Sequence, residues 1–78
     1  MDYQQIVKLE IGDELSIDNN KHGKVLANIE SGKFSEAYRK EDWEYLQSGL
    51  LIYTDFGGVI HYSSEQLTTE NFNTKNQK

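Results

Sequence analysis

The residues of this chain that could do chemistry begin with its two histidines, His22 and His61. Histidines and a carboxylate can bind a metal ion, but these two stand far apart and neither belongs to a short ligand spacing. Ser63 follows His61 by two residues, and on one strand face they would lie about 7 Å apart, too far for a direct hydrogen bond. We therefore expect a solvated loop histidine and a sheet histidine, with no catalytic residues and no metal site. An enzyme or metal centre around these histidines is kept as a third hypothesis, after the two that are given below.

Three acids, Glu41, Asp42 and Glu44, stand beside Trp43. Paired carboxylates perform acid–base catalysis when a pocket separates their pKa values. Acids at the start of a helix instead stabilise its dipole, and that is the role we expect here. The glycines do not have the spacing of a phosphate-binding loop or of a dinucleotide-binding motif, so no cofactor is implied.

The charge balance is acidic, with 8 Lys and Arg against 13 Asp and Glu and a net charge of −5. Nucleic-acid binding draws much of its free energy from cations placed against phosphates, and here only Arg39 and Lys40 form a close pair within the folded part. A small nucleic-acid-binding barrel that uses Lys21, Lys24, Arg39 and Lys40 is therefore the alternative hypothesis. An acidic surface suits solubility, and it suits docking onto a basic patch of another protein.

With 78 residues, the chain has room for one domain with a small core. The absence of cysteine excludes disulfides, thiolate metal sites and cysteine nucleophiles. No secretory signal and no membrane-spanning run is visible, so we expect a cytoplasmic protein without membrane contact, either monomer or homodimer. Residues 1–72 are predicted to form a single small β-rich domain, and residues 73–78 a polar, disordered tail.

Alternating apolar residues predict three strands in the first part of the chain. They are expected at residues 7–11, 14–17 and 24–30. Between the second and the third, residues 18–23 are rich in Asn and Asp and end in glycine, which predicts a loop. Pairing Ile17 with Val25 keeps the apolar side chains of both strands on one face, and this is the expected register.

Residues 34–48 predict a helical insertion of two short pieces, because the polar tract 39–42 interrupts any single apolar stripe. The second piece is expected at 41–47. Acids fill its first turn, and Gly49 is expected to close its C-terminus.

The strongest local pattern lies at residues 50–63, which predict a β-hairpin with a glycine-bearing turn. Thr54 is expected to pair with Val59. Both faces of the hairpin are apolar, so we expect it in the centre of the sheet. Ser64 is predicted to cap a single helical turn, and a short closing strand is predicted near 69–72.

Two stretches resemble SH3-like small barrels. GDELSI (12–17) and GKVL (23–26) resemble the first strand and the return after the first long loop, while LLIY (50–53) through HY (61–62) and then EQL (65–67) resemble the distal hairpin and its helical turn. The expected fold is therefore mainly β: a small SH3-like, partly open barrel with a short helical insertion between the second and third barrel strands.

Among SH3-like barrels, the pattern resembles the small accessory barrels of electron-transport and metalloenzyme systems. This resemblance implies a docking subunit or a regulator without chemistry of its own. The acidic-aromatic pattern of the SH3 domains that bind proline-rich peptides is missing, so binding of that kind is not implied.

Aromatic residues are the most suggestive feature, since five Tyr, three Phe and one Trp make up 12% of the chain. Tyr53, Tyr62 and Trp43 are expected to fill the core. Rings in the insertion and at the hairpin tip are expected to be exposed beside acids, which is typical of a protein-binding patch. The predicted partner-binding residues are Phe34, Tyr38, Trp43, Tyr45 and Phe56.

The alternative for these rings is that the insertion folds back and buries them over the barrel. The leading hypothesis is a non-enzymatic small acidic binding protein that docks on a larger protein as an accessory subunit, inhibitor or regulator. If an acidic rim surrounds the patch, association should weaken with added salt.

Overall fold

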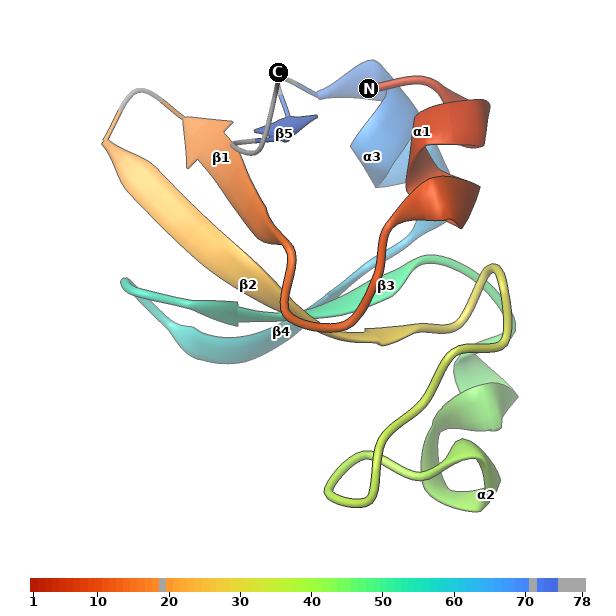
Figure 1. Ribbon diagram of the computed structural model, residues 1–78. Coiled ribbons are helices and arrows are strands. Elements are labelled where there is room, and N and C mark those ends of the chain that lie inside the picture. The colour runs from red at the N-terminus through yellow and green to blue at the C-terminus, as the bar shows by residue number, and fades with distance from the viewer. Residues whose placement is uncertain (19, 71, 75–78) are drawn as a thin grey trace.

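The computed structural model describes residues 1–18, 20–70 and 72–74, and it contains one sheet of five antiparallel strands (Figure 1). The strand order is β4-β3-β2-β1-β5. The strands are β1 (Glu14–Asp18), β2 (Lys21–Asn28), β3 (Leu50–Thr54), β4 (Gly58–Tyr62) and β5 (Asn73–Thr74). The helices are α1 (Tyr3–Lys8), α2 (Lys40–Trp43), the 3₁₀ helix η1 (Glu44–Leu46) and α3 (Ser64–Thr69). The prediction of a mainly β fold is confirmed, and within the described residues the sheet is open.

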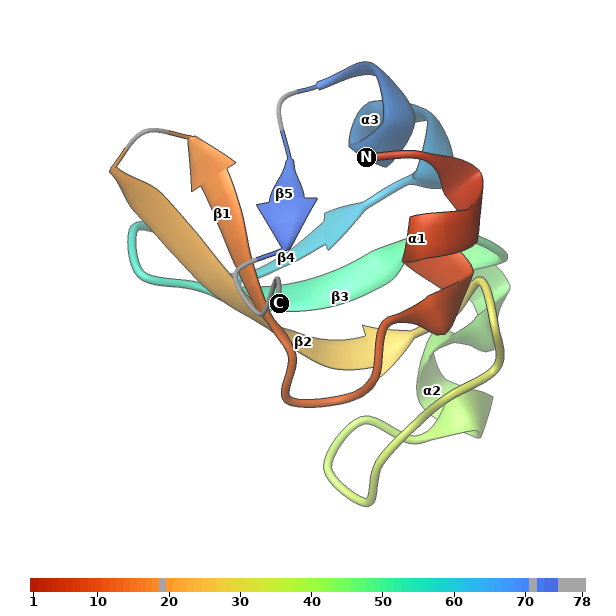
Figure 2. The same cartoon turned by 45° about the horizontal axis from the view of Figure 1, so that its top comes forward.

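One face of the curled sheet is covered by α1 and α3, which lie side by side (Figures 1 and 2). The main core lies between these helices and the sheet, and burial of its apolar side chains is the chief favourable contribution to folding. Its buried members are Ile6, Leu9, Leu15, Val25, Leu50, Ile52, Leu67 and Phe72. We call this covered face the inner face and the opposite one the outer face.

The strand predicted at residues 7–11 is wrong, because α1 ends at Lys8 and a cap and a turn follow it before β1. A capping box starts the helix: the Asp2 carboxylate accepts a hydrogen bond from the Gln5 amide at 2.8 Å, and the Gln5 side chain accepts one from the Asp2 amide at 2.9 Å. Ile6 and Leu9, three residues apart, turn to the core together. The helical spacing of Ile6 and Leu9 therefore determines the structure here, and the alternation of apolar residues at 7–11 does not.

Asn28 joins the end of α1 to β2 from a fully buried position. Its side-chain amide donates to the carbonyl oxygens of Ile6 at 2.7 Å and Leu9 at 3.0 Å, and its side-chain oxygen accepts from the Ser31 amide at 3.2 Å. Each polar atom of the side chain is therefore satisfied, which makes this burial favourable.

Asn28→Ala should lower the free energy of unfolding by about 2 kcal/mol, because buried backbone groups of α1 and of the Ser31 turn lose their partner. Urea unfolding followed by circular dichroism measures this change. Asn20→Ala, at an exposed turn position, is the control and should stay within about 0.5 kcal/mol of the parent chain. Equal stability of the two variants would contradict the role given to Asn28.

The register of β1 and β2 differs from the predicted one, because Leu15 lies opposite Gly23 instead of pairing Ile17 with Val25. β2 begins at Lys21, so most of the predicted loop at 18–23 belongs to strands. A side chain at Gly23 would collide with that of Ile52. The glycine therefore lets β2 pass close to the core side chains of β3.

The β3–β4 hairpin forms as predicted, but its register is shifted by one residue, with Thr54 opposite Gly58. The Thr54 hydroxyl fixes the turn, since it accepts from the Gly57 amide at 2.9 Å and donates to the Gly58 carbonyl at 2.8 Å. A shift of one residue exchanges the faces of a strand. Tyr62 thus joins the inner face, and Val59 lies beside Tyr53 on the outer face.

The hairpin is also not central, because β4 is an edge strand and β2 lies in the middle of the sheet order. After β4, the cap of α3 is Ser63 instead of the predicted Ser64, again in a capping box with Gln66. The short closing strand predicted near 69–72 instead lies at Asn73–Thr74, where β5 pairs with β1. Phe72 is a buried core residue.

The last described residues, Asn73 and Thr74, form β5 and pair with β1. The tail predicted at 73–78 therefore contributes its first two residues to the sheet. Residues 75–78 lie outside the described residues.

Candidate protein-binding surface

The insertion between β2 and β3 folds back onto the outer face of the sheet (Figure 1). There it covers a second small cluster made of Ala27, Ile29 and Leu51. The side chains that pack against this cluster are Leu26, Phe34, Tyr38, Trp43 and Leu46. The expected exposure of Phe34 and Tyr38 is therefore wrong: both rings are half-buried, as is Trp43.

Helical structure in the insertion is confined to α2 and η1, which follow one another directly, so the first of the two predicted pieces is absent from the described residues 34–39. In its place, Ser35 and Tyr38 exchange backbone hydrogen bonds of 3.1 and 3.2 Å. The left-handed residue that ends η1 is Gln47, with φ of 72°, instead of Gly49.

Two acids of the insertion, Glu41 and Asp42, lie in the first turn of α2, as predicted, whereas Glu44 begins η1. The Arg39 guanidinium is 3.4 Å from Glu41 and 3.6 Å from Asp42, so these carboxylates are ion-paired within their own segment. All three side chains are exposed, and such pairs add little to stability. The arrangement supports a helix-start role for Glu41 and Asp42.

The exposed apolar surface instead concentrates at the β3–β4 hairpin. Tyr53 is 56% exposed, Phe56 46% and Val59 41%. Tyr53 and Val59 are direct cross-strand partners on the outer face, and Phe56 lies in the turn between their strands. We call these three residues the hairpin patch. The expectation that Tyr53 fills the core is wrong, whereas Tyr62 does pack against the core.

The five predicted partner-binding residues do not form one surface. Phe56 lies at the hairpin turn, whereas the insertion enters β3 at its opposite end (Figure 1). Within the insertion only Tyr45 is largely exposed, at 70%. Tyr38 and Trp43 pack against each other, with ring centroids 6.1 Å apart.

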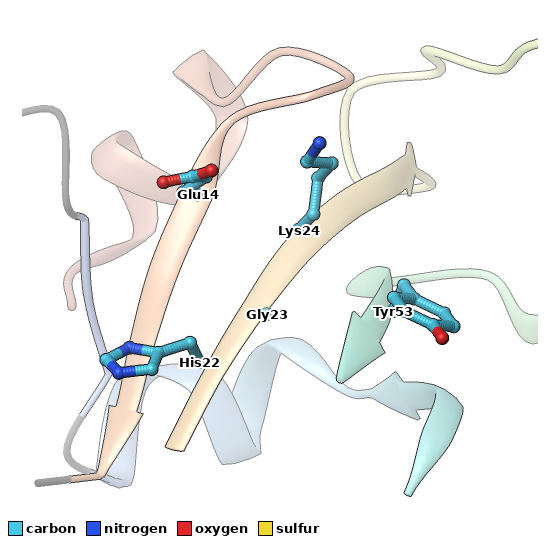
Figure 3. A pocket seen from close by; sticks show the side chains of 5 residues that line it. All are labelled: Glu14, His22, Gly23, Lys24 and Tyr53. Atoms are coloured by element: carbon cyan, nitrogen blue, oxygen red, sulfur yellow. The ribbon is translucent and has the colours of Figure 1, made fainter. Parts of the chain in front are cut away.

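Beside the hairpin patch lies a shallow, open hollow of about 200 Å³ (Figure 3). Its floor is the backbone of β2 at Gly23, and the side chains around it are Glu14, His22, Lys24 and Tyr53. Glu14, Lys24 and Tyr53 are consecutive cross-strand neighbours on β1, β2 and β3. On the outer face, the exposed Tyr53 ring therefore lies beside charged side chains of both signs.

The two histidines lie apart and have different surroundings. His22 is paired through its backbone with Asp55 at the hairpin turn, whereas His61 lies near the insertion, with Nε2 2.8 Å from the Ser48 carbonyl oxygen. The Ser63 hydroxyl caps α3. No group of three potential metal ligands occurs among the described residues. These positions do not bring a nucleophile, a base and an acid together.

The basic residues of the nucleic-acid alternative also separate. The Lys21 ammonium lies 5.0 Å from the centre of the Phe56 ring, a cation–π contact at the hairpin turn. Lys24 lies on the outer face of β2, whereas Arg39 and Lys40 belong to the insertion. The four cations therefore do not line one continuous basic stripe, which nucleic-acid binding would favour.

Two tyrosines have raised pKa values, and both lie outside the hairpin patch. Burial raises the pKa of Tyr62, and the nearby Glu70 carboxylate raises it further. The pKa of Tyr3 is raised mainly by the hydrogen bond that its hydroxyl donates to Glu30 at 2.8 Å. The pKa shift of Tyr62 thus follows from its packing on the inner face, and that of Tyr3 from its hydrogen bond at α1.

Comparison of the chain with family models, with curated proteins and with solved structures found no match. In the part of the chain that the structure describes, none of the helices has the length and apolar character to cross a membrane. The candidate surface therefore rests on the geometry alone.

Proposed function

We propose that this chain is a non-enzymatic binding domain that docks on a larger protein as an accessory subunit, inhibitor or regulator. The observation that carries the proposal is the hairpin patch, in which Tyr53 and Val59 are exposed side by side on the outer face and the Phe56 ring is exposed in the turn between their strands. Exposed tyrosine and phenylalanine supply large contact areas at protein interfaces. The surface is thus centred on the hairpin, away from the insertion.

The proposed architecture is a small SH3-like, partly open barrel. The strand order β4-β3-β2-β1-β5, with α3 placed between β4 and β5, supports this interpretation. The helical insertion between β2 and β3 is compatible with it, because it packs on the outer face and leaves the inner core to α1 and α3.

The charges around the patch define what a partner must offer. Lys24 lies beside Tyr53, with Glu14 beyond it, and the Lys21 ammonium lies over the Phe56 ring. A partner surface with an apolar centre for Tyr53 and polar groups of both signs around it fits this arrangement. Glu41 and Asp42 of the insertion lie farther away and pair with Arg39.

Capture from a lysate of the cells in which the chain occurs tests the proposal. The parent chain should retain a specific protein, and Tyr53→Ala should weaken its affinity about tenfold or more, as expected for an aromatic at the centre of an interface. Tyr45→Ala is the control, because it removes an even more exposed ring from the insertion.

Both variants should keep the circular dichroism of the parent chain. Failure to capture any protein would refute the proposed function. Loss of the partner with Tyr45→Ala but not with Tyr53→Ala would move the binding surface to the insertion, contrary to the proposal.

A further inference from the structure

The free edge of β4 is a feature of the sheet that the proposed function does not use. Among the described residues β4 pairs only with β3, and its five residues, GVIHY, contain no charge and no proline. Its pairing with β3 has no bulge. Proteins protect exposed edge strands with charges, prolines, bulges or covering segments, and β4 has none of the first three. An edge of this kind favours pairing with another strand.

We propose that two copies of this chain pair antiparallel through their β4 strands and join their sheets into one. A second copy is the fitting occupant because a β4 edge is complementary to itself about a two-fold axis. With the axis at Ile60, Val59 lies opposite His61 of the second copy. The exposed part of Val59 then gains a cover, and Ile60 meets its own counterpart.

The charges at the two ends of β4 complement each other in this arrangement. The hairpin turn carries the Lys21 ammonium, held over Phe56. The other end of β4 leads directly into α3, where Glu65 is exposed. Glu70 follows α3, and its carboxylate is near enough to Tyr62 to raise the pKa of that residue. Antiparallel pairing places the turn of each copy beside α3 of the other, so Lys21 meets these acids.

The one acid of the turn, Asp55, is directed to its own chain. Its carboxylate accepts the His22 amide at 3.2 Å. The strand between the charged ends is neutral, so the net charge of −5 is not concentrated at the interface. The other edge strand, β5, has two residues in the described part of the chain and offers a shorter pairing surface there.

Such a dimer adds to the proposed function and does not depend on it. The two-fold axis runs perpendicular to the joined sheet, so both outer faces lie on the same side. The Tyr53 and Phe56 rings of both copies would then be presented together, with Val59 of each copy at the interface and Tyr53 one strand away from it. A partner with two equivalent sites would bind such a dimer with increased avidity.

Equilibrium sedimentation of the purified chain tests the proposal. The expected mass is twice that of a single chain, and Val59→Lys should raise the dissociation constant at least about tenfold by placing a charge beside the paired edge. Ile11→Lys is the matched control, because Ile11 is 40% exposed and lies in the turn before β1. It should leave the dimer intact.

Charge exchange provides a second test that leaves β4 unchanged. Lys21→Glu and Glu65→Lys should each weaken the dimer, and the double variant should restore it. A monomeric parent chain at millimolar concentration, a mass larger than a dimer, or equal effects of Val59→Lys and Ile11→Lys would overturn the proposal. A double variant that dimerises more weakly than both single variants would also overturn the proposal.

Discussion

Phe72→Ala should lower the free energy of unfolding by about 3–5 kcal/mol, the usual cost of removing a buried phenylalanine. Phe72 is only 1% exposed, and its ring meets the edge of the Tyr62 ring with centroids 4.9 Å apart. Folded domains of this length have a total stability of about 4–12 kcal/mol. The variant should therefore be close to unfolded in buffer, although the substitution lies near the end of the chain.

Urea unfolding followed by circular dichroism measures the effect, and Phe56→Ala is the matched control. The Phe56 ring is half exposed and contacts Lys21, so its removal should cost less than about 1 kcal/mol. If the two variants were equally stable, the residues that follow α3 would not contribute to the core as described.

The elements that could be predicted from the sequence are those set by local patterns. The alternation at 14–17, the two apolar runs around Gly57 and the acids at the start of the second helical piece each led to the right kind of element, whereas the first helical piece predicted in the insertion is absent from residues 34–39. The helix α1 was missed, although Asp2 and Gln5 have the spacing of a capping box. Apolar alternation over five residues was too short to decide between strand and helix.

Strand register could not be predicted from apolar pattern alone. In the hairpin it depends on the turn, where the Thr54 side chain bonds to the backbone of both glycines and shifts β4 by one residue. That single shift turns Tyr62 inward, and it places Val59 beside the outward-facing Tyr53. In β1 and β2, the register depends on the close approach of Gly23 to Ile52, and this contact exists only in the folded sheet.

The candidate surface was predicted in part. Phe56 and Tyr45 are exposed as expected, but Phe34 and Tyr38 cover the second cluster. A signal for this was present in the sequence, because Leu51 alternates with the inner-face residues of β3 and so needs cover on the outer face. The segment just before β3 was the one able to provide that cover.

Gly49→Ala should lower the free energy of unfolding by about 3–5 kcal/mol through two separate effects. The residue has φ of +89°, a left-handed conformation that disfavours alanine. In addition, a Cβ atom there would overlap with the Tyr62 carbonyl oxygen and lie 2.9 Å from Cα of Ser63. Both contacts are with backbone, so no side-chain rotation can relieve them.

Gly49 cannot move away without loss of other contacts, because it joins the insertion to the sheet. Its carbonyl oxygen accepts the amides of Ile29 at 2.9 Å and Glu30 at 3.2 Å, and its own amide donates to the Glu30 carboxylate at 3.0 Å. Shifting the backbone by the distance that a methyl group needs would weaken these bonds together. The insertion would then lose its fixed position over the second cluster.

Gly32→Ala separates the two effects, since Gly32 has a similar φ of +77° but open space around its Cβ position. It should cost only about 1–2 kcal/mol, the price of the backbone conformation alone. Chemical unfolding of the two variants in parallel measures the difference. A Gly49 variant no less stable than the Gly32 variant would mean that β4 and the start of β3 are not held as closely as described, and a pairing edge at β4 would then lose its rigid support.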